Sequence, residues 1–326
     1  MAATGAPALE MQIQGQLFHV PNRHHSKIRP ARRCLADPCW RALYGISAAL
    51  VAAAFCAPAN AAGCAADSSE HRVALLELYT SEGCNSCPPA DRWLNGLQDR
   101  GTGTSQVVPL AFHVDYWDYI GWKDRFAKPE FSQRQRLIAS RNQSSFIYTP
   151  QFVLNGRDFR HARKQGGLEE RLKAINAEAA GIRIRLEQTG RQNKVRVALR
   201  AHNADSTSAH VFLVLFQNDL SSEIKAGENV GKKLYHEFVV RELKGPLPVA
   251  PGASVERAFE FDLGALADPA DLGFAVFAEN AISGENLQAM AVPLCDRTAA
   301  AFTPGASIAR ADQEARVRHS ATKPVN

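Results

Sequence analysis

The stretch SEGCNSCPPAD, residues 81–91, places two cysteines three residues apart and follows the second with two prolines. It comes directly after RVALLELY (residues 72–79), a short apolar run that predicts a buried strand. A helix is expected from about Pro88, because proline suits the first turn of a helix and apolar residues follow at Trp93 and Leu97. The cysteine pair is therefore expected between the end of a strand and the start of a helix.

This position gives the cysteine pair a physical reason to be reactive. Unpaired backbone N–H groups at a helix start favour a thiolate over a thiol. Cys84 would then attack a partner sulfur and Cys87 would resolve the mixed disulfide. Pro88 and Pro89 disfavour helical geometry at Cys87, and a helix that starts near Cys87 would help Cys84 less. A single C-x-x-C also occurs in metal sites, but structural zinc normally needs two more ligands, and the sequence has no second such pair.

Residues 1–61 have the pattern of a targeting segment. Six Lys or Arg precede an uncharged run, residues 42–57, that is short for a membrane span and suits a signal peptide. Ala59 and Ala61 form a small-x-small cleavage pattern, so we expect a mature chain from about Ala62 and a periplasmic or secreted location.

The leader leaves three alternatives open. Its length before the apolar run is consistent with a start site downstream of Met1, or with a twin-arginine signal at Arg32 and Arg33. The third is lipidation of Cys64, although small and polar residues stand where a lipoprotein signal usually has large aliphatic ones.

The positive charge of the chain belongs to this leader. The full sequence has 38 Lys and Arg against 33 Asp and Glu, and the chain after residue 61 has 32 against 31, a net charge of +1. Charge therefore gives no reason to expect nucleic acid or an anionic membrane as a partner, and no membrane span is expected in the mature chain.

Four of the seven cysteines remain after the leader, an even number that fits an oxidising compartment. Because Cys84 and Cys87 already form a local pair, parity predicts a disulfide between Cys64 and Cys295. Two unrelated thiols are the alternative for Cys64 and Cys295.

The chain up to about Ala180 alternates strands and helices. A second strand is expected over residues 106–114, a helix over 132–141, a hairpin with its turn at Asn155-Gly156, and an amphipathic helix over 166–180. This order predicts one compact α/β domain over residues 62–180.

The composition then changes. Seven or so short segments with period-two alternation follow, and they predict an antiparallel β-sandwich of immunoglobulin or fibronectin size over residues 181–296. Residues 297–326 lack periodicity and are expected to form a flexible tail.

A second element strengthens the redox hypothesis. FIYTPQFVLNG (residues 146–156) has Thr149-Pro150 immediately before a predicted strand and a tight turn. With the dithiol, it resembles the thioredoxin-like superfamily, in which a cis-proline begins the strand that faces the redox cysteines. The resemblance covers residues 72–180 and implies a thioredoxin-like fold, with Cys84 and Cys87 as redox pair and Thr149-Pro150 as the cis-proline site. A trans proline at the start of an edge strand is the alternative.

The resemblance also implies a role for Glu77. Thioredoxins keep a buried acid close to this position, where it exchanges protons with the resolving cysteine, and desolvation would suit such a role. The spacing between Glu77 and Cys84 differs by one residue from the corresponding spacing in thioredoxins. The alternative is a glutamate at the strand end that faces solvent. Glu82-Gly83 stands where the superfamily has an aromatic residue, which makes the approach to the sulfur more acidic.

Four blocks narrow the resemblance to one group. Residues 76–91, 112–127, 148–156 and 227–243 closely resemble secreted bacterial thioredoxin-like proteins catalogued as a domain of unknown function. This resemblance implies a fold and a location but no established substrate.

Aromatic and ionisable residues in two of these blocks are candidates for binding a substrate: His113, Asp115, Trp117, Trp122 and His236. In a thioredoxin fold the first four would follow a strand whose carboxyl end lies near the dithiol. The alternative is a capped loop whose aromatic rings fill a satellite core. Three residues of the second predicted domain would either reach across to the cysteine pair or stabilise a long hairpin: Asn229, His236 and Arg241.

Three functions follow from these features. The first is an exported thiol–disulfide oxidoreductase that forms mixed disulfides with protein thiols or small thiols and needs no cofactor beyond its own disulfide. The second is a copper-binding or other soft-metal module that uses Cys84, Cys87 and His113. The third is a non-catalytic interaction protein with a structural disulfide. The sequence leaves the substrate, the direction of electron flow and the oligomeric state open.

Overall fold

The structure is a computed structural model that describes residues 64–295, except residues 165, 192, 265 and 267–268. The predicted leader and the predicted tail lie outside the described residues. Of the described residues, 44% lie in strands and 18% in helices. Residues in strands therefore outnumber residues in helices by more than two to one.

The strands are β1 Cys64–Asp67, β2 Ala74–Thr80, β3 Val107–His113, β4 Gln151–Leu154, β5 Arg157–Asp158, β6 Ile182–Arg191, β7 Lys194–Asn203, β8 Ala209–Gln217, β9 Leu220–Glu223, β10 Lys233–His236, β11 Val239–Val249, β12 Ser254–Asp262, β13 Leu272–Asn280 and β14 Asn286–Pro293. The helices are α1 Pro88–Asn95, α2 Pro129–Arg141 and α3 Gly167–Ile175, and the 3₁₀-helices are η1 Gln98–Arg100, η2 Asp115–Ile120 and η3 Pro269–Asp271. The elements expected before residue 180 are present with boundaries shifted by a few residues.

The strand before the cysteines is buried on both faces. Every residue of β2 is buried, and its side chains alternate between two packed layers. Leu78 pairs with Phe152, whose ring meets Trp93 of α1 edge-on at 5.0 Å. On the opposite face Tyr79 stacks on Phe112 at 5.4 Å. This packing holds the carboxyl end of β2, and so the cysteine loop, in a fixed position.

The prediction of a thioredoxin-like α/β domain followed by a separate β-sandwich is wrong. Eight strands form one sheet in the order β14-β13-β8-β11-β3-β2-β4-β5, so strands from both predicted domains share it. The two halves meet where Val239 of β11 pairs in parallel with Ala111 of β3, and the Ala111 N–H donates to the Phe238 carbonyl at 2.8 Å. One hydrophobic core runs across this junction, from Leu75 to Phe277. The division into domains near Ala180 stays a prediction.

Strands β8 and β13 are buried on both faces, because each face covers a different core. Phe212 and Phe277 stack at 5.0 Å in the core shared with β2 and β3. Their neighbours Leu213 and Val276 point the other way, into a second core closed by the four-stranded sheet β1-β6-β7-β12. β1, which was expected in the first domain, pairs with β6 of the second. A near-continuous apolar sequence such as HVFLVLF in β8 is what such double burial requires.

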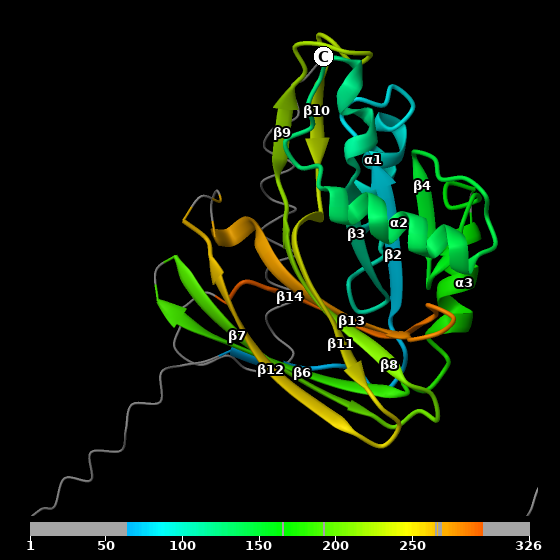
Figure 1. Cartoon of the computed structure of the whole chain (residues 1–326), viewed down its shortest axis with the longest axis vertical. Helices are drawn as coiled ribbons and strands as arrows, with labels where there is room; N and C mark the ends of the chain where they lie inside the picture. The colour runs from blue at the N-terminus through cyan, green and yellow to red at the C-terminus, as the bar shows by residue number, and fades with distance from the viewer. Residues whose placement is uncertain (1–63, 165, 192, 265, 267–268, 296–326) are drawn as a thin grey trace, which may run out of the picture. The chain divides into compact units, whose positions relative to one another are not determined.

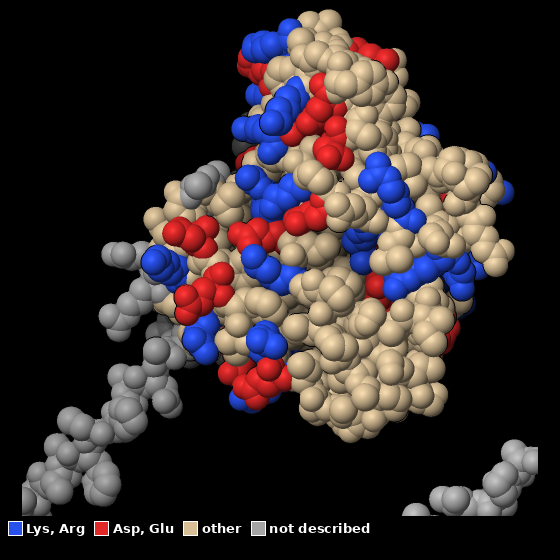
Figure 2. All heavy atoms as spheres, in the orientation of Figure 1, with Lys and Arg blue, Asp and Glu red and all other residues tan. Residues whose placement is uncertain are grey.

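The outer face of the four-stranded sheet carries charges of both signs. Arg200 of β7 pairs with Glu256 of β12 at 3.0 Å, and Arg196 lies 3.8 Å from Glu260. Figure 2 shows Lys and Arg interspersed with Asp and Glu over this part of the molecule. The alternation fits solvent-exposed strands and forms no basic patch of the kind that binds nucleic acid.

A hairpin leaves the large sheet next to α1. β9 and β10 form a two-stranded sheet of their own. The chain bends on entering and on leaving this hairpin, at two residues with positive φ: Asp219 (50°) between β8 and β9, and Phe238 (57°) between β10 and β11. Figure 1 shows the hairpin rising beside α1. Asn95 at the end of α1 donates to the Tyr235 carbonyl at 2.9 Å and accepts the Glu237 N–H at 3.2 Å. These bonds hold β10 against the helix that follows the cysteines.

Among the residues that the structure describes, no helix is both long enough and apolar enough to cross a membrane.

Candidate redox site

Cys84 and Cys87 form a disulfide in the loop between β2 and α1, with their Cα atoms 5.4 Å apart. Both cysteines have no solvent-exposed surface, while Asn85 and Ser86 between them are exposed. The loop therefore presents its backbone and two small polar side chains to solvent and keeps its sulfur atoms covered.

The helix starts after the disulfide, as the double proline indicates. Cys87 is the N-cap residue of α1, and its carbonyl accepts the N–H groups of Ala90 and Asp91 at 2.8 and 3.1 Å. Pro88 and Pro89 contribute no N–H groups to the first turn. A thiolate on Cys84, three residues before the cap, would thus find fewer helix donors than a thiolate at the cap itself.

The Thr149–Pro150 peptide bond is cis and lies beside the cysteine loop. Tyr79 pairs with Gln151 in the antiparallel β2–β4 ladder, and continuing that register places Thr149 opposite Ser81. Ser81 is three residues before Cys84. The structure thus brings together the residues that the resemblance assigned to a redox pair and a cis-proline site.

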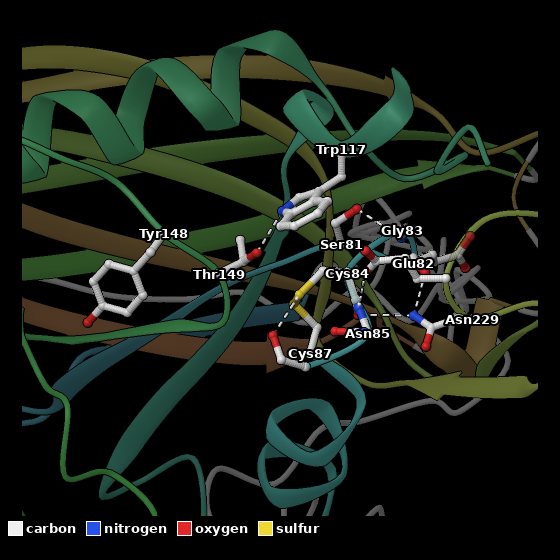
Figure 3. Close-up of a disulfide and its surroundings, with 12 residues drawn as sticks. Ser81, Glu82, Gly83, Cys84, Asn85, Cys87, Trp117, Tyr148, Thr149 and Asn229 are labelled. Carbon is white, nitrogen blue, oxygen red and sulfur yellow. Dashed lines mark hydrogen bonds between the residues drawn. A yellow bond between two sulfur atoms is a disulfide. The ribbon is translucent and has the colours of Figure 1, made fainter. Parts of the chain in front are cut away.

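Trp117 of η2 spans the space over the disulfide. Its Cβ lies 3.1 Å from where a Cβ on Gly83 would stand, and its Nε1 donates to Thr149 Oγ1 at 2.7 Å. In Figure 3 the indole lies over the sulfur atoms between these two anchors. The ring and its hydrogen bond therefore contribute to the burial of both cysteines.

Replacing Trp117 with alanine should expose the disulfide. We expect reduction by dithiothreitol under native conditions to become roughly ten- to a hundredfold faster, because losing the ring and its bond would lower the opening free energy by about 1.4–3 kcal/mol. Stopped-flow thiol release measures this rate. Tyr119→Ala is the matched control, because Tyr119 lies in the same 3₁₀-helix and is 82% exposed. An unchanged rate in Trp117→Ala would show that the ring does not limit access.

The tip of the β9–β10 hairpin holds the cysteine loop from the other side. The buried side chain of Asn229 donates to the carbonyls of Glu82 and Cys84 at 2.8 and 3.0 Å. The Asn85 N–H donates to Glu228 at 3.2 Å. Figure 3 shows Asn229 on the side of the loop opposite Thr149. The GENVGKK segment, residues 227–233, thus fixes the backbone of the cysteine loop rather than reaching the sulfur atoms.

Behind the loop lies a buried cluster of two histidines and two acids. His113 Nδ1 lies 2.6 Å from Asp124 Oδ2, and both side chains are fully buried. Glu82 Oε1 lies 3.3 Å from His236 Nε2, and the rings of the two histidines are 4.9 Å apart. The Glu82 N–H also donates to Asp124 at 2.9 Å, so the backbone of the cysteine loop is tied to the cluster.

These contacts set the charges of the cluster. Burial alone would lower the pKa of His113, but the charge and hydrogen bond of Asp124 raise it above its usual value. Burial would raise the pKa of Asp124, but the charge and hydrogen bond of His113 lower it, so each partner favours the charged form of the other. Burial would likewise raise the pKa of Glu82, whereas its contact with His236 lowers it. An ionised Glu82 two residues before Cys84 disfavours a second negative charge on that sulfur.

Asp91 lies one helical turn after Cys87, and its N–H donates to the Cys87 carbonyl. Its side chain is buried, and burial raises its pKa, with partial compensation from the charges of His236 and His113. Asp91 and Asp124 were not predicted, because neither stands in a periodic pattern or a known spacing. The usable signal for Asp91 would have been an acidic residue in the first helical turn after the C-x-x-C pair.

Glu77 and Asp115 lie elsewhere. Glu77 is buried, which excludes the solvent-facing alternative, but its Oε1 accepts from Arg134 Nε at 2.7 Å. Asp115 accepts from Ser132 Oγ at 2.5 Å and so joins η2 to α2. Within the described contacts neither acid reaches Cys84 or Cys87. Arg241 donates to Gln217 in the large sheet, away from the cysteine loop.

Trp122 lies beside the buried cluster, where its Nε1 donates to Glu82 Oε2 at 2.8 Å.

In residues 64–295, as far as they are described, no group of three or more His, Cys, Asp or Glu is arranged to hold a metal ion. The copper alternative with Cys84, Cys87 and His113 therefore stays a prediction from the sequence.

Cys64 and Cys295 form a second disulfide, with Cα atoms 6.0 Å apart and a sequence separation of 231. It joins the start of β1 to the residues that follow β14. This bridge closes nearly the whole described chain into a loop, and long loops are where a disulfide removes the most entropy from the unfolded state.

Two solved structures are similar to this chain. A crystal structure of a protein from Agrobacterium tumefaciens is 26% identical, with a TM-score of 0.50, and the match covers 72% of this chain and all of that one. HBP35 of Porphyromonas gingivalis is 16% identical, with a TM-score of 0.54 over 73% of this chain and 82% of that one, a likeness in fold alone. No curated protein matches the chain.

The sequence also matches a family model described as a protein of unknown function, DUF1223. The match runs over residues 75–279, which is more than half of the chain and includes the cysteine loop, the cis-proline and the hairpin tip. It confirms the expected relationship to a domain of unknown function. The chain belongs to the DUF1223 family.

Proposed function

We propose that the protein is an exported thiol–disulfide oxidoreductase whose active group is the Cys84–Cys87 disulfide. The observation that carries this proposal is the position of the disulfide: it lies at the start of α1 with the cis Thr149–Pro150 bond beside it. Thioredoxin-like redox proteins, which this part of the sequence resembles, share that juxtaposition. The partner is a protein thiol, a small thiol or a dedicated redox protein.

The exchange balances without a further cofactor. A substrate thiolate attacks Cys84 Sγ, the Cys84–Cys87 bond breaks, and Cys87 leaves with the electron pair and takes up a proton. A second substrate thiolate then attacks the mixed disulfide and releases Cys84 as thiolate. The substrate dithiol is oxidised by two electrons and the protein disulfide is reduced by two, and the same steps run in reverse from the dithiol form.

Export agrees with the cysteine pairing. Disulfides persist in oxidising compartments, and the described chain contains two of them. The targeting pattern in residues 1–61 supports the same location, periplasmic or secreted.

A structural disulfide is the second candidate, because both cysteines are completely buried. A buried disulfide exchanges only when its surroundings open, whereas a catalytic one must open often. The rate and reversibility of exchange in the folded protein therefore distinguish the two functions.

Equilibration with glutathione tests the proposal. We expect Cys84 and Cys87 of the folded protein to pass reversibly from disulfide to dithiol as the ratio of reduced to oxidised glutathione rises, with two thiols alkylated per chain and read by mass spectrometry. The Cys64–Cys295 bridge is the internal reference and should stay oxidised longest. A Cys84–Cys87 pair that is reduced only when the protein unfolds would reject the proposal and support a structural disulfide.

A further inference from the structure

A cavity of about 370 Å³ opens beside the cis-proline. Four aromatic rings line it, those of Phe146, Tyr148, Phe152 and Phe159, together with Pro150. This volume and lining suit a ring-sized apolar group, because small-ligand sites are concave and mostly apolar with a few polar groups at defined places. Phe146 is 55% exposed, which is unusual for a large apolar side chain next to a cavity that could bury it.

The cavity and the disulfide lie on opposite sides of one short segment, residues 148–150. Thr149 bonds to Trp117 on the disulfide side, whereas the ring of Tyr148 points away from the sulfur atoms (Figure 3). Pro150 belongs to the cavity wall. An extended polypeptide advances about 3.3 Å per residue with alternating side chains, so a chain laid along this segment would reach both places within a few residues.

The rim of the cavity is positively charged. Arg160 lies over the rings of Phe146 and Tyr148, at 6.0 and 5.7 Å from their centroids, and pairs with Asp158 at 2.8 Å. Tyr148 also donates to Asp158 at 2.7 Å, so both carboxylate oxygens of Asp158 have partners. Arg163 lines the cavity too, is exposed, and makes no ion pair within the described part of the chain. One positive charge at the rim is thus unmatched, and it favours an anionic group next to the ring that enters.

We propose that this cavity is the specificity pocket of the exchange reaction: it receives an aromatic side chain of a cysteine-containing polypeptide, and Arg163 binds an acidic residue beside that side chain. The inference rests on the proposed function, since it requires the substrate cysteine to face Cys84. The aromatic side chain stands one or three residues from that cysteine, because alternate side chains of an extended chain point to opposite sides, and the flanking Asp or Glu stands next to the aromatic residue.

Short cysteine peptides test the pocket. One set carries Phe one or three residues before or after the cysteine, with Asp next to the Phe, and the reference set carries Ala and Lys at the same places. We expect the better Phe-Asp peptide to form the mixed disulfide with Cys84 at least about tenfold faster than its reference, because an apolar pocket discriminates a ring from a methyl group by at least that factor. Glutathione, which has no aromatic group, gives the baseline rate.

Two charge reversals locate the acidic contact. Arg163→Glu should remove most of the preference for the Phe-Asp peptide, measured within the variant as the ratio of its exchange rate to that of the Ala-Lys peptide. Arg171→Glu is the matched control, because Arg171 is exposed on α3, does not line the cavity and changes the net charge equally. An equal loss of preference in both variants would show a general charge effect and would contradict the contact with Arg163.

Serine versions of the peptides, which cannot exchange, separate this inference from the proposed function. We expect the Phe-Asp serine peptide to bind wild-type protein more tightly than its Ala-Lys version by calorimetry. Equal binding and equal exchange rates would overturn the pocket and leave the oxidoreductase standing. Absence of exchange with glutathione and with every peptide would overturn the oxidoreductase, and the serine peptides would still decide the pocket.

Discussion

Arg134→Met is expected to lower the free energy of unfolding by about 3–5 kcal/mol, because it leaves a buried carboxylate without its cation. Arg134 of α2 is almost fully buried and bonds to Glu77 at 2.7 Å and to Glu279 at 3.2 Å. Burial would lower its pKa, but the two acids raise it well above its usual value. Its guanidinium also lies 4.7 Å from the centroid of the Phe277 ring. Urea unfolding followed by tryptophan fluorescence measures the loss.

Two further variants separate the buried charge from the packing. Arg134→Met combined with Glu77→Gln should recover part of the loss, because the uncompensated carboxylate is then gone. Arg185→Met is the surface control: Arg185 pairs with Asp67 and Glu187 on exposed strands, and we expect a change within about 1 kcal/mol. A loss in Arg134→Met no larger than in Arg185→Met would contradict the role assigned to Arg134.

Arg134 also shows why the fold class could not be read from the sequence. The helix over residues 132–141 was predicted, but an arginine in an amphipathic helix reads as a solvent-facing residue. Here it is buried between Glu77 of β2 and Glu279 of β13, the strands that the prediction placed in different domains. No local pattern marks that partnership, because the two acids are about 200 residues apart in sequence.

The single large sheet was missed for a similar reason. Period-two alternation and turn residues located most strands, since both signals are local. The joint between β11 and β3 rests on one parallel pair, Val239 with Ala111, at a bend where Phe238 has positive φ. Pairing of this kind depends on tertiary packing and leaves no mark on either strand alone. The place of β1 in the four-stranded sheet likewise depends on its pairing with β6, which is distant in sequence.

The site was more predictable than the fold. The spacing of Cys84 and Cys87 and the Thr149-Pro150 pair identified segments that the structure does bring together. The roles predicted for Glu77 and Asp115 are not supported by their contacts, which are with Arg134 and Ser132. The number of residues between a carboxylate and the cysteines does not determine which side chain that carboxylate contacts. Asp91, Asp124 and the cover formed by Trp117 depend on how η2 and the hairpin pack on the cysteine loop. Those are long-range contacts, so only the three-dimensional structure reveals them.

Cys87→Ser is expected to change the protein from one that holds no thiol adduct to one that holds one adduct per chain. In this variant the Cys84 thiolate attacks oxidised glutathione, a Cys84–glutathione disulfide forms, and one reduced glutathione leaves. The wild-type protein should not accumulate the adduct, because Cys87, held at a Cα–Cα distance of 5.4 Å, displaces the glutathione. Cys84→Ser is the control, since its remaining thiol is the one expected to resolve rather than to attack.

The measurement that tests the redox role most directly is the mass of folded Cys87→Ser after brief incubation with oxidised glutathione. We predict one glutathione per chain, located on Cys84 and released by dithiothreitol, and little or none on Cys84→Ser. A Cys87→Ser protein that stays unmodified while folded, and takes up glutathione only after unfolding, would contradict a redox-active disulfide.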